Sequence, residues 1–289
     1  MTSMRIDAHH HVWDLAARDQ PWIIGPAMEP IRRSFGVDDL APELAARDVG
    51  GTVLVQTVAS RAESLELLTI AARTSFVLGV VGYVDLTATD VGDQLDELIE
   101  SPAGGHLVGI RHVVEAESDS RWLARPDVID GLRAVAHREL IYDLLVKPHQ
   151  LDAAIEAVAN VPQGRFVLDH LGKPPIADGC REPWATQLAA LARFENVSAK
   201  LSGLVTEADW SSWSTSDLAP YVDHALEIFG PHRLMFGSDW PVCLLASTYS
   251  EVVDAVDALV AQLSADESDS LFEGTATAVY GLRARQVPS

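Results

Sequence analysis

The sequence predicts a closed (β/α)8 barrel, the α/β fold called a TIM barrel, formed as a single domain. Eight short apolar segments occur in order, segments with helical spacing lie between most of them, and polar residues follow where the apolar segments end. Continuous apolar runs such as residues 77–81 are typical of parallel strands covered on both faces. The chain has 289 residues, of which 48% are hydrophobic, so it can bury a large core. We expect one barrel domain over residues 1–289.

The predicted strands are rich in Val, Ile and Leu, and they span residues 4–8, 52–57, 76–84, 107–111, 141–146, 165–169, 196–200 and 233–237. The predicted crossover helices span residues 62–74, 91–100, 126–138, 151–159, 183–194, 217–229 and 249–263. An open doubly wound sheet is the alternative fold for such alternation. No Gly-rich phosphate-binding sequence follows any of the strands, and this favours the closed barrel.

Composition excludes several classes of partner. The net charge of −21 repels nucleic-acid phosphates and anionic lipids, and the longest apolar runs are too short to span a bilayer. The N-terminal residues lack the charged and then apolar layout of a signal peptide. Two cysteines, Cys180 and Cys243, are too few for a disulfide framework. We expect a cytoplasmic protein with a small-molecule substrate and neither nucleic-acid nor membrane partners, and the oligomeric state is left open.

Three consecutive histidines end the first predicted strand. Because side chains alternate along a strand, His9 and His11 point to one side and His10 to the other. Imidazole is a common metal ligand and transfers protons near neutral pH. An affinity-tag remnant is the alternative, but three residues are too few and they sit inside a strand pattern. The pattern therefore predicts two imidazoles that converge on one point.

Ionisable and polar residues also follow the later strands. These are Arg111 and His112, Lys147 and His149, Asp169 and His170, Lys200 and Ser202, and finally Ser238, Asp239 and Trp240. A lone histidine at a strand end is more often structural. In a barrel, however, the carboxyl ends of all strands meet at one mouth, and buried charge without a purpose is costly. Their recurrence therefore predicts an active site there.

Three motifs carry a family resemblance: His9-x-His11, Leu168-Asp169-His170, and Gly237-Ser238-Asp239-Trp240-Pro241. Supporting stretches lie at residues 21–22, 30–35, 109–112, 169–174 and 200–204. Together, over residues 4 to 281, they resemble the amidohydrolase superfamily in its amidohydrolase-related (amidohydrolase 2) branch. Within that branch the chain is most similar to the sugar-lactone and pyrone-dicarboxylate lactonase group.

The resemblance implies a metal or metal-free site formed by His9, His11, His170 and Asp239. One divalent metal, with zinc as a candidate, or none is expected. Members with two metals bridge them with a modified lysine or a carboxylate, often from the fourth strand, where this chain has Arg111. Asp239 is expected to activate water, and the imidazoles to polarise the carbonyl, with His170 touching the substrate. The alternative for Asp239 is a carboxylate that only ties down the barrel rim.

Arg111 presents a rigid fork of donors and is expected to orient the substrate. Its alternative is a salt bridge with Glu115 or Glu117. Indoles offer a flat apolar surface to a sugar ring and an N–H donor. We therefore expect substrate contacts from three tryptophans on or near the same loops, Trp13, Trp22 and Trp240, although any of them can simply cap the barrel.

Lys147 is expected to bind substrate oxygens, and His149 to contact substrate or add a ligand. The alternative for Lys147 is an ion pair with Asp143 or Asp169 at the barrel mouth. Cys243 follows Trp240 closely, but no base accompanies it in the sequence, so no nucleophilic role is expected.

The function implied is a hydrolase that opens a lactone ring. A dicarboxylate lactone would favour several arginines at the mouth, whereas the strand ends supply one, with others confined to loops. We therefore expect a neutral five- or six-membered aldonolactone, for example of fucose, rhamnose, galactose or arabinose. A metal-dependent decarboxylase of aromatic or muconate-type acids is one alternative. A binding barrel without catalysis is another.

Overall fold

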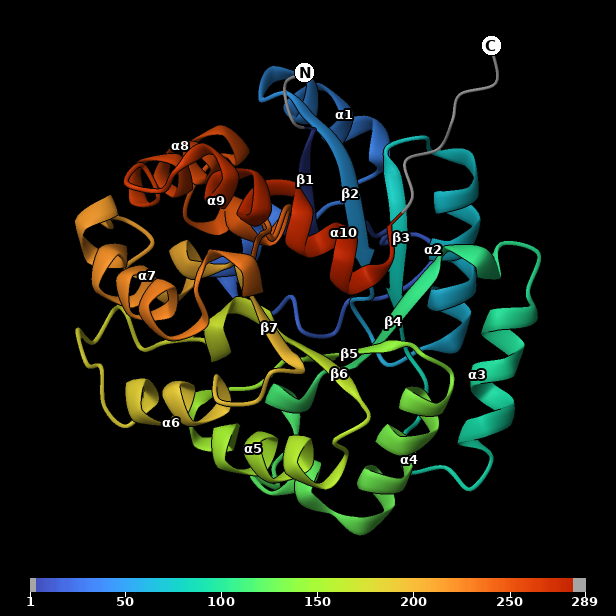
Figure 1. Ribbon diagram of the computed structural model, residues 1–289. Helices are drawn as coiled ribbons and strands as arrows, with labels where there is room; N and C mark the ends of the chain where they lie inside the picture. The colour runs from blue at the N-terminus through green and yellow to red at the C-terminus, as the bar shows by residue number, and fades with distance from the viewer. Residues whose placement is uncertain (1–3, 283–289) are drawn as a thin grey trace.

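Eight parallel strands form one sheet in the computed structural model, which describes residues 4–282 (Figure 1). They are β1 (Arg5–His10), β2 (Val49–Val55), β3 (Val77–Gly82), β4 (Leu107–His112), β5 (Ile141–Leu144), β6 (Arg165–Leu168), β7 (Val197–Leu201) and β8 (Leu234–Phe236). Each strand pairs in parallel with the next one along the chain. All eight predicted strands are confirmed.

The two ends of the sheet meet at β1 and β8. His10 and Trp240 form a parallel bridge there, the Asp239 N–H donates to the His9 carbonyl at 2.8 Å, and the His11 N–H donates to the Trp240 carbonyl at 2.7 Å. Because these bonds join the first strand to the last, the sheet is a ring. The prediction of a (β/α)8 barrel is confirmed, and the open doubly wound alternative is wrong.

Helices surround the ring on its outside, as Figure 1 shows. They are α1 (Val37–Ala46), α2 (Arg61–Arg73), α3 (Val91–Glu100), α4 (Pro126–His137), α5 (Leu151–Asn160), α6 (Trp184–Leu191), α7 (Thr215–Phe229) and α8 (Tyr249–Leu259). The large apolar cluster between helices and strands includes Leu68, Leu132, Trp184 and Tyr249. None of the helices within residues 4–282 is long and apolar enough to cross a membrane.

The last helices close one end of the barrel. They are α9 (Ala265–Asp269), a π-helical turn η10 (Ser270–Gly274) and α10 (Thr275–Tyr280). Ala276 and Tyr280 pack with barrel-interior residues such as Ile6 and Val53, and with Leu78 near the start of β3. In Figure 1, α10 lies in front of the strands. The amino ends of the strands are thus covered, and the opposite end is left to the loops that carry the site.

Short 3-10 helices follow several strands at that opposite end. They include η3 (Val114–Ala116), η5 (Pro148–Gln150), η6 (Asp169–Gly172), η7 (Leu204–Glu207) and η9 (Val242–Leu245). Because each begins within a few residues of a strand's carboxyl end, the side chains that follow the strands are held on short, ordered connections.

Candidate active site

The histidines of β1 lie as their alternation predicts. The Nε2 atoms of His9 and His11 are 3.2 Å apart at the carboxyl end of the barrel. His10 turns the other way, and its Nε2 lies 2.9 Å from the Thr52 hydroxyl on β2. His11 Nδ1 lies 2.7 Å from the Val55 carbonyl, so this nitrogen carries the proton and leaves Nε2 as a free lone pair.

His170 and Asp239 join these histidines from β6 and β8. One ligand atom each from His9, His170 and Asp239 lies within 4.8 Å of the other two, and all three residues are buried. The Asp239 Oδ1 atom also lies 3.4 Å from His11 Nε2. The chain therefore brings together three imidazoles and one carboxylate. Such a nitrogen and oxygen donor set fits a single divalent ion such as Zn²⁺.

The backbone at His170 and Asp239 is in the left-handed region, which costs free energy for residues other than glycine. The φ angles are 52° at His170, 51° at Leu171, 54° at Lys173 and 58° at Asp239. Residues in such conformations cluster at functional sites, where the surrounding structure enforces them. This unusual backbone sets the orientation of both His170 and Asp239, the two candidate catalytic residues.

The end of β7 supports His170. The Ser202 Oγ lies 2.8 Å from His170 Nδ1, on the ring side opposite the nitrogen that faces Asp239. Gly203 follows with φ of 62°, and a Cβ atom there would lie 2.6 Å from His170 Nδ1 and 3.1 Å from Asp239 Oδ2. Only glycine allows the chain to pass this close to both side chains.

The surroundings of Asp239 favour its ionised form. Burial alone would raise the pKa of Asp239, but the imidazoles of His170, His11 and His9 hold that pKa well below its usual range. Burial lowers the pKa of His170, with Asp239 and Asp169 acting in the opposite direction. At neutral pH the carboxylate can therefore accept a proton, and the imidazole keeps a lone pair.

Beneath the site lies a fully buried charge network that the sequence interpretation missed. The Lys200 ammonium is 2.6 Å from Asp143 Oδ2, 2.9 Å from Asp169 Oδ1 and 3.1 Å from His9 Nδ1. The Arg111 Nη1 donates to Asp169 Oδ2 at 3.0 Å. The signal was present in the sequence, because a charged residue interrupts the apolar runs of β5 and β7. What was missing was the knowledge of which residues pair.

Arg111 belongs both to this network and to the substrate cavity. It is only 3% exposed, and its Nη2 donates to the Gln56 carbonyl. Its carboxylate partner is Asp169, so the alternative of a salt bridge with Glu115 or Glu117 is wrong. Arg111 also lines the cavity described next.

A cavity of about 430 Å³ opens over the histidines and Asp239. His11, His170, Arg111, Lys147 and Trp22 are among its lining residues. The structure thus brings Arg111, Lys147 and Trp22 together with the candidate catalytic groups. Lys147 is exposed, and the carboxylates proposed as its alternative partners, Asp143 and Asp169, both pair with Lys200 instead.

Three other predicted substrate contacts lie outside this cavity. Trp240 is 3% exposed and packs edge-on against Phe35, with ring centroids 5.4 Å apart. Trp13 packs edge-on against the same phenylalanine and against Trp22. His149 is exposed and does not line the cavity. A direct contact of these three residues with substrate stays a prediction.

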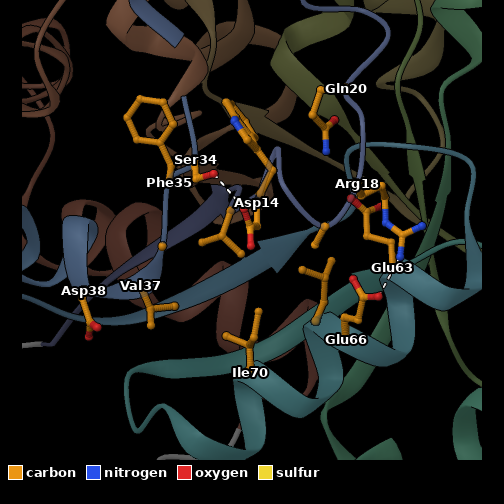
Figure 2. A pocket seen from close by; sticks show the side chains of 15 residues that line it. Asp14, Arg18, Gln20, Ser34, Phe35, Val37, Asp38, Glu63, Glu66 and Ile70 are labelled. Atoms are coloured by element: carbon orange, nitrogen blue, oxygen red, sulfur yellow. Dashed lines mark hydrogen bonds and ion pairs between the residues drawn. The ribbon is translucent and has the colours of Figure 1, made fainter. Parts of the chain in front are cut away.

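Trp13 also borders a second cavity of about 390 Å³, which Figure 2 shows. Four of its polar side chains form two pairs: the Ser34 hydroxyl donates to Asp14 at 2.9 Å, and Arg18 donates to Glu66 at 2.7 Å. The second cavity is therefore a side pocket, separate from the cluster of imidazoles.

Comparison with known proteins shows the family of the chain. The chain matches the family described as Amidohydrolase over residues 6–282. It is 40% identical to an L-fucono-1,5-lactonase of Burkholderia multivorans over 98% of this chain and 97% of that protein, and 39% identical to an L-fucono-1,5-lactonase of Burkholderia ambifaria over 86% and 84%. A crystal structure of a Burkholderia multivorans amidohydrolase with bound zinc is 38% identical, with a TM-score of 0.91, covering 97% of this chain and 100% of that one. From its sequence, its barrel and the residues at its mouth, this chain belongs to the amidohydrolase family.

Proposed function

We propose that this protein hydrolyses a sugar lactone, and that L-fucono-1,5-lactone is the first substrate to test. The observation that carries the proposal is the Asp239 carboxylate beside the imidazoles of His9, His11 and His170. Asp239, His11 and His170 line a cavity of about 430 Å³. Two relatives at 39% and 40% identity carry the name L-fucono-1,5-lactonase and support it. The cavity also presents Lys147 and Trp22, a cation and an indole suited to the oxygens and the ring of a sugar.

Asp239 acts as the base in this proposal. Its Oδ1 faces the imidazoles, 3.4 Å from His11 Nε2 and 3.7 Å from His9 Nε2, so Oδ2 is left for the attacking water. As the water oxygen bonds to the lactone carbonyl carbon, Asp239 accepts the proton. When the ring C–O bond breaks, Asp239 returns that proton to the ring oxygen, and the product is the open hydroxy acid.

Arg111 holds the reacting ester, and His170 lines the cavity beside it. The Arg111 guanidinium supplies donors and positive charge to the cavity that His170 and Asp239 also line, and there it stabilises the carbonyl oxygen as it becomes an oxyanion. Arg111 is fixed by Asp169 and by the Gln56 carbonyl, so it is already oriented before substrate binds. We infer that it positions the lactone rather than transferring a proton.

We also propose that His9, His170 and Asp239, with His11 beside them, hold one zinc ion. The donor set and the zinc-bound crystal structure of the Burkholderia multivorans relative support this. Bound zinc would polarise the carbonyl as a Lewis acid. Zinc content after dialysis should be about one per chain in the wild type, as expected for a mononuclear site, and His170→Ala should lower it. Equal zinc content in both proteins would contradict this ligand set.

The activity test is hydrolysis of a panel of aldonolactones and dicarboxylate lactones, followed with a pH indicator. We expect turnover of a sugar lactone and a loss of about 10²- to 10⁴-fold in Asp239→Asn, whose fold is checked by circular dichroism. No turnover by the wild type across the panel would overturn the proposal, and carbon dioxide release from an aromatic acid would then point to a decarboxylase.

The free thiols Cys180 and Cys243 support our further proposal of a cytoplasmic location.

A further inference from the structure

Three charged side chains, here called the rim triad, form part of the cavity wall: Glu115, Lys173 and Glu207. They come from the connections after β4, β6 and β7, three strands of the ring. The Lys173 ammonium lies 2.7 Å from Glu115 Oε2 and 3.4 Å from Glu207 Oε1. Their side chains are 20% to 23% exposed, and all three line the same cavity as Asp239.

The two carboxylates of the rim triad are not equally neutralised. The nearby Lys173 ammonium brings the pKa of Glu115 below its ordinary value against the effect of burial, whereas burial leaves the pKa of Glu207 raised in spite of Lys173. Within residues 4–282, Lys173 is the one ion-pair partner of Glu207, and it is the more distant of the two contacts. Glu207 thus keeps acceptor capacity directed to the cavity.

A structural ion pair does not explain this arrangement well. Lys147 lines the same cavity and, like Lys173, lowers the pKa of Glu115, so Glu207 is the carboxylate left without a close cation, with Lys173 Nζ 3.4 Å from its Oε1. A partly buried carboxylate in that position is costly without a further donor. Sugar hydroxyls are such donors, because a carboxylate accepts hydrogen bonds from two neighbouring hydroxyls at once. A second carboxylate on the substrate would be repelled where it faced Glu207.

We infer that Glu207, backed by Lys173 and Glu115, binds the ring hydroxyls of the lactone and selects neutral polyhydroxy lactones over lactones that carry a second carboxylate. This inference rests on the proposed function and assigns the substrate class to named residues. Glu207 is a specificity residue that contacts substrate away from the reacting carbonyl. Lys173 and Glu115 are positioning residues, since they act through Glu207.

The first experiment measures kcat and KM of Glu207→Ala and Glu207→Gln with L-fucono-1,5-lactone and with a pyrone dicarboxylate. We expect KM for the sugar lactone to rise about 10- to 100-fold in Glu207→Ala, with a much smaller change in kcat, because a charged hydrogen bond remote from the carbonyl is lost. The preference for the neutral over the anionic lactone should fall in both variants. A general loss of structure would not depend on substrate charge in this way.

Glu97→Gln is the matched control, because Glu97 also pairs with a cation, Arg61, at 2.6 Å but lies on the outer surface of α3. A sugar lactone lacking one ring hydroxyl supplies the second readout. The wild type should bind the deoxy lactone that lacks the hydroxyl contacting Glu207 more weakly than the parent lactone. Glu207→Ala should bind the two lactones equally. An active wild type whose Glu207 variants behave like Glu97→Gln would overturn this inference alone. A wild type without sugar-lactone turnover would overturn the proposed function and the inference with it.

Discussion

At the scale of single residues, Gly203 has the sharpest consequence for the site. A Cβ atom on Gly203 would lie 2.6 Å from His170 Nδ1, closer than real Cβ contacts come. We predict that Gly203→Ala displaces His170 and lowers kcat/KM about 10²-fold, the usual effect of moving a catalytic group by about an ångström. The measurement is steady-state hydrolysis of the sugar lactone.

Gly179 provides a control for the backbone part of this effect. It has the same φ of 62°, but nothing lies within 4 Å of the Cβ position. Gly179→Ala and Gly203→Ala should therefore share a loss of stability of about 1–2 kcal/mol from the left-handed conformation, measured by thermal unfolding. Only Gly203→Ala should lose activity. Equal activity in the two variants would contradict the close approach.

Ser202 gives the second prediction at this scale. Its hydroxyl lies 2.8 Å from His170 Nδ1 and fixes the orientation of the ring. Ser202→Ala should lower kcat/KM about 10-fold, in the range seen when the partner of a ligand histidine is removed. Ser198→Ala, four residues earlier on β7, should leave kcat/KM unchanged. A drop of the same size in both variants would mean that the strand, and not the hydrogen bond, is responsible.

At the scale of elements, the seam between β1 and β8 is where the barrel depends on individual side chains. Asp7 accepts bonds from the Ser238 N–H at 2.8 Å and the Ser238 hydroxyl at 2.6 Å, and from the Tyr249 hydroxyl at 3.3 Å. The Ser238 hydroxyl also accepts from the Trp240 N–H at 3.0 Å. The side chains of Asp7 and Ser238 thus reinforce the backbone bonds that join the short strand β8 to β1.

We predict that Ser238→Ala lowers the free energy of unfolding by about 1–3 kcal/mol, because it leaves part of a fully buried carboxylate without its donor. Tyr249→Phe should have the smaller effect, since its bond to Asp7 is longer. Urea unfolding of both variants is the measurement. A larger loss in Tyr249→Phe than in Ser238→Ala would show that the bond from α8 to Asp7 matters more to the seam than the Ser238 hydroxyl does.

The elements also show what a sequence can and cannot predict. The eight strands were predictable because parallel strands covered on both faces read as continuous apolar runs. Helix α1 was not, since Pro42 lies in its interior, where proline is expected to break a helix. Its first turn forms because the Asp39 carboxylate accepts the Gly36 N–H at 2.8 Å. Helix α10 was missed as well, because which segment covers the barrel end depends on tertiary packing and not on local sequence.

The same division holds for the site. The convergence of His9 and His11 follows from strand alternation, and the arrival of His170 and Asp239 follows from barrel geometry. The prediction of a sugar-lactone hydrolase agrees with the names of the two relatives at 39% and 40% identity. The pairing of Lys200 with Asp143 and Asp169 depends on how far these side chains reach across the strands. Hydrophobic periodicity in the sequence does not predict this.

At the scale of the whole molecule, the covered end of the barrel is connected to the site. The Tyr280 hydroxyl on α10 donates to Asp143 at 2.8 Å, Asp143 pairs with Lys200, and Lys200 reaches His9. The last described helix thus contacts, through two buried charges, the histidine that begins the active site. Tyr280, Asp143, Lys200 and His9 are all buried. Each of these hydrogen bonds is therefore electrostatically stronger than one at the surface.

We predict that Tyr280→Phe lowers the free energy of unfolding by about 1–2 kcal/mol, because Asp143 loses one donor but keeps its ion pair. Lys200→Met should lower it by about 3–5 kcal/mol, since it leaves two buried carboxylates without their shared cation. Chemical unfolding measures both, and sugar-lactone hydrolysis by Tyr280→Phe measures transmission to His9. Because Lys200 still holds both carboxylates in Tyr280→Phe, its activity should fall less than that of Ser202→Ala. A fall as large as that of Ser202→Ala would mean that α10 sets the geometry of the catalytic histidines and does more than close the barrel.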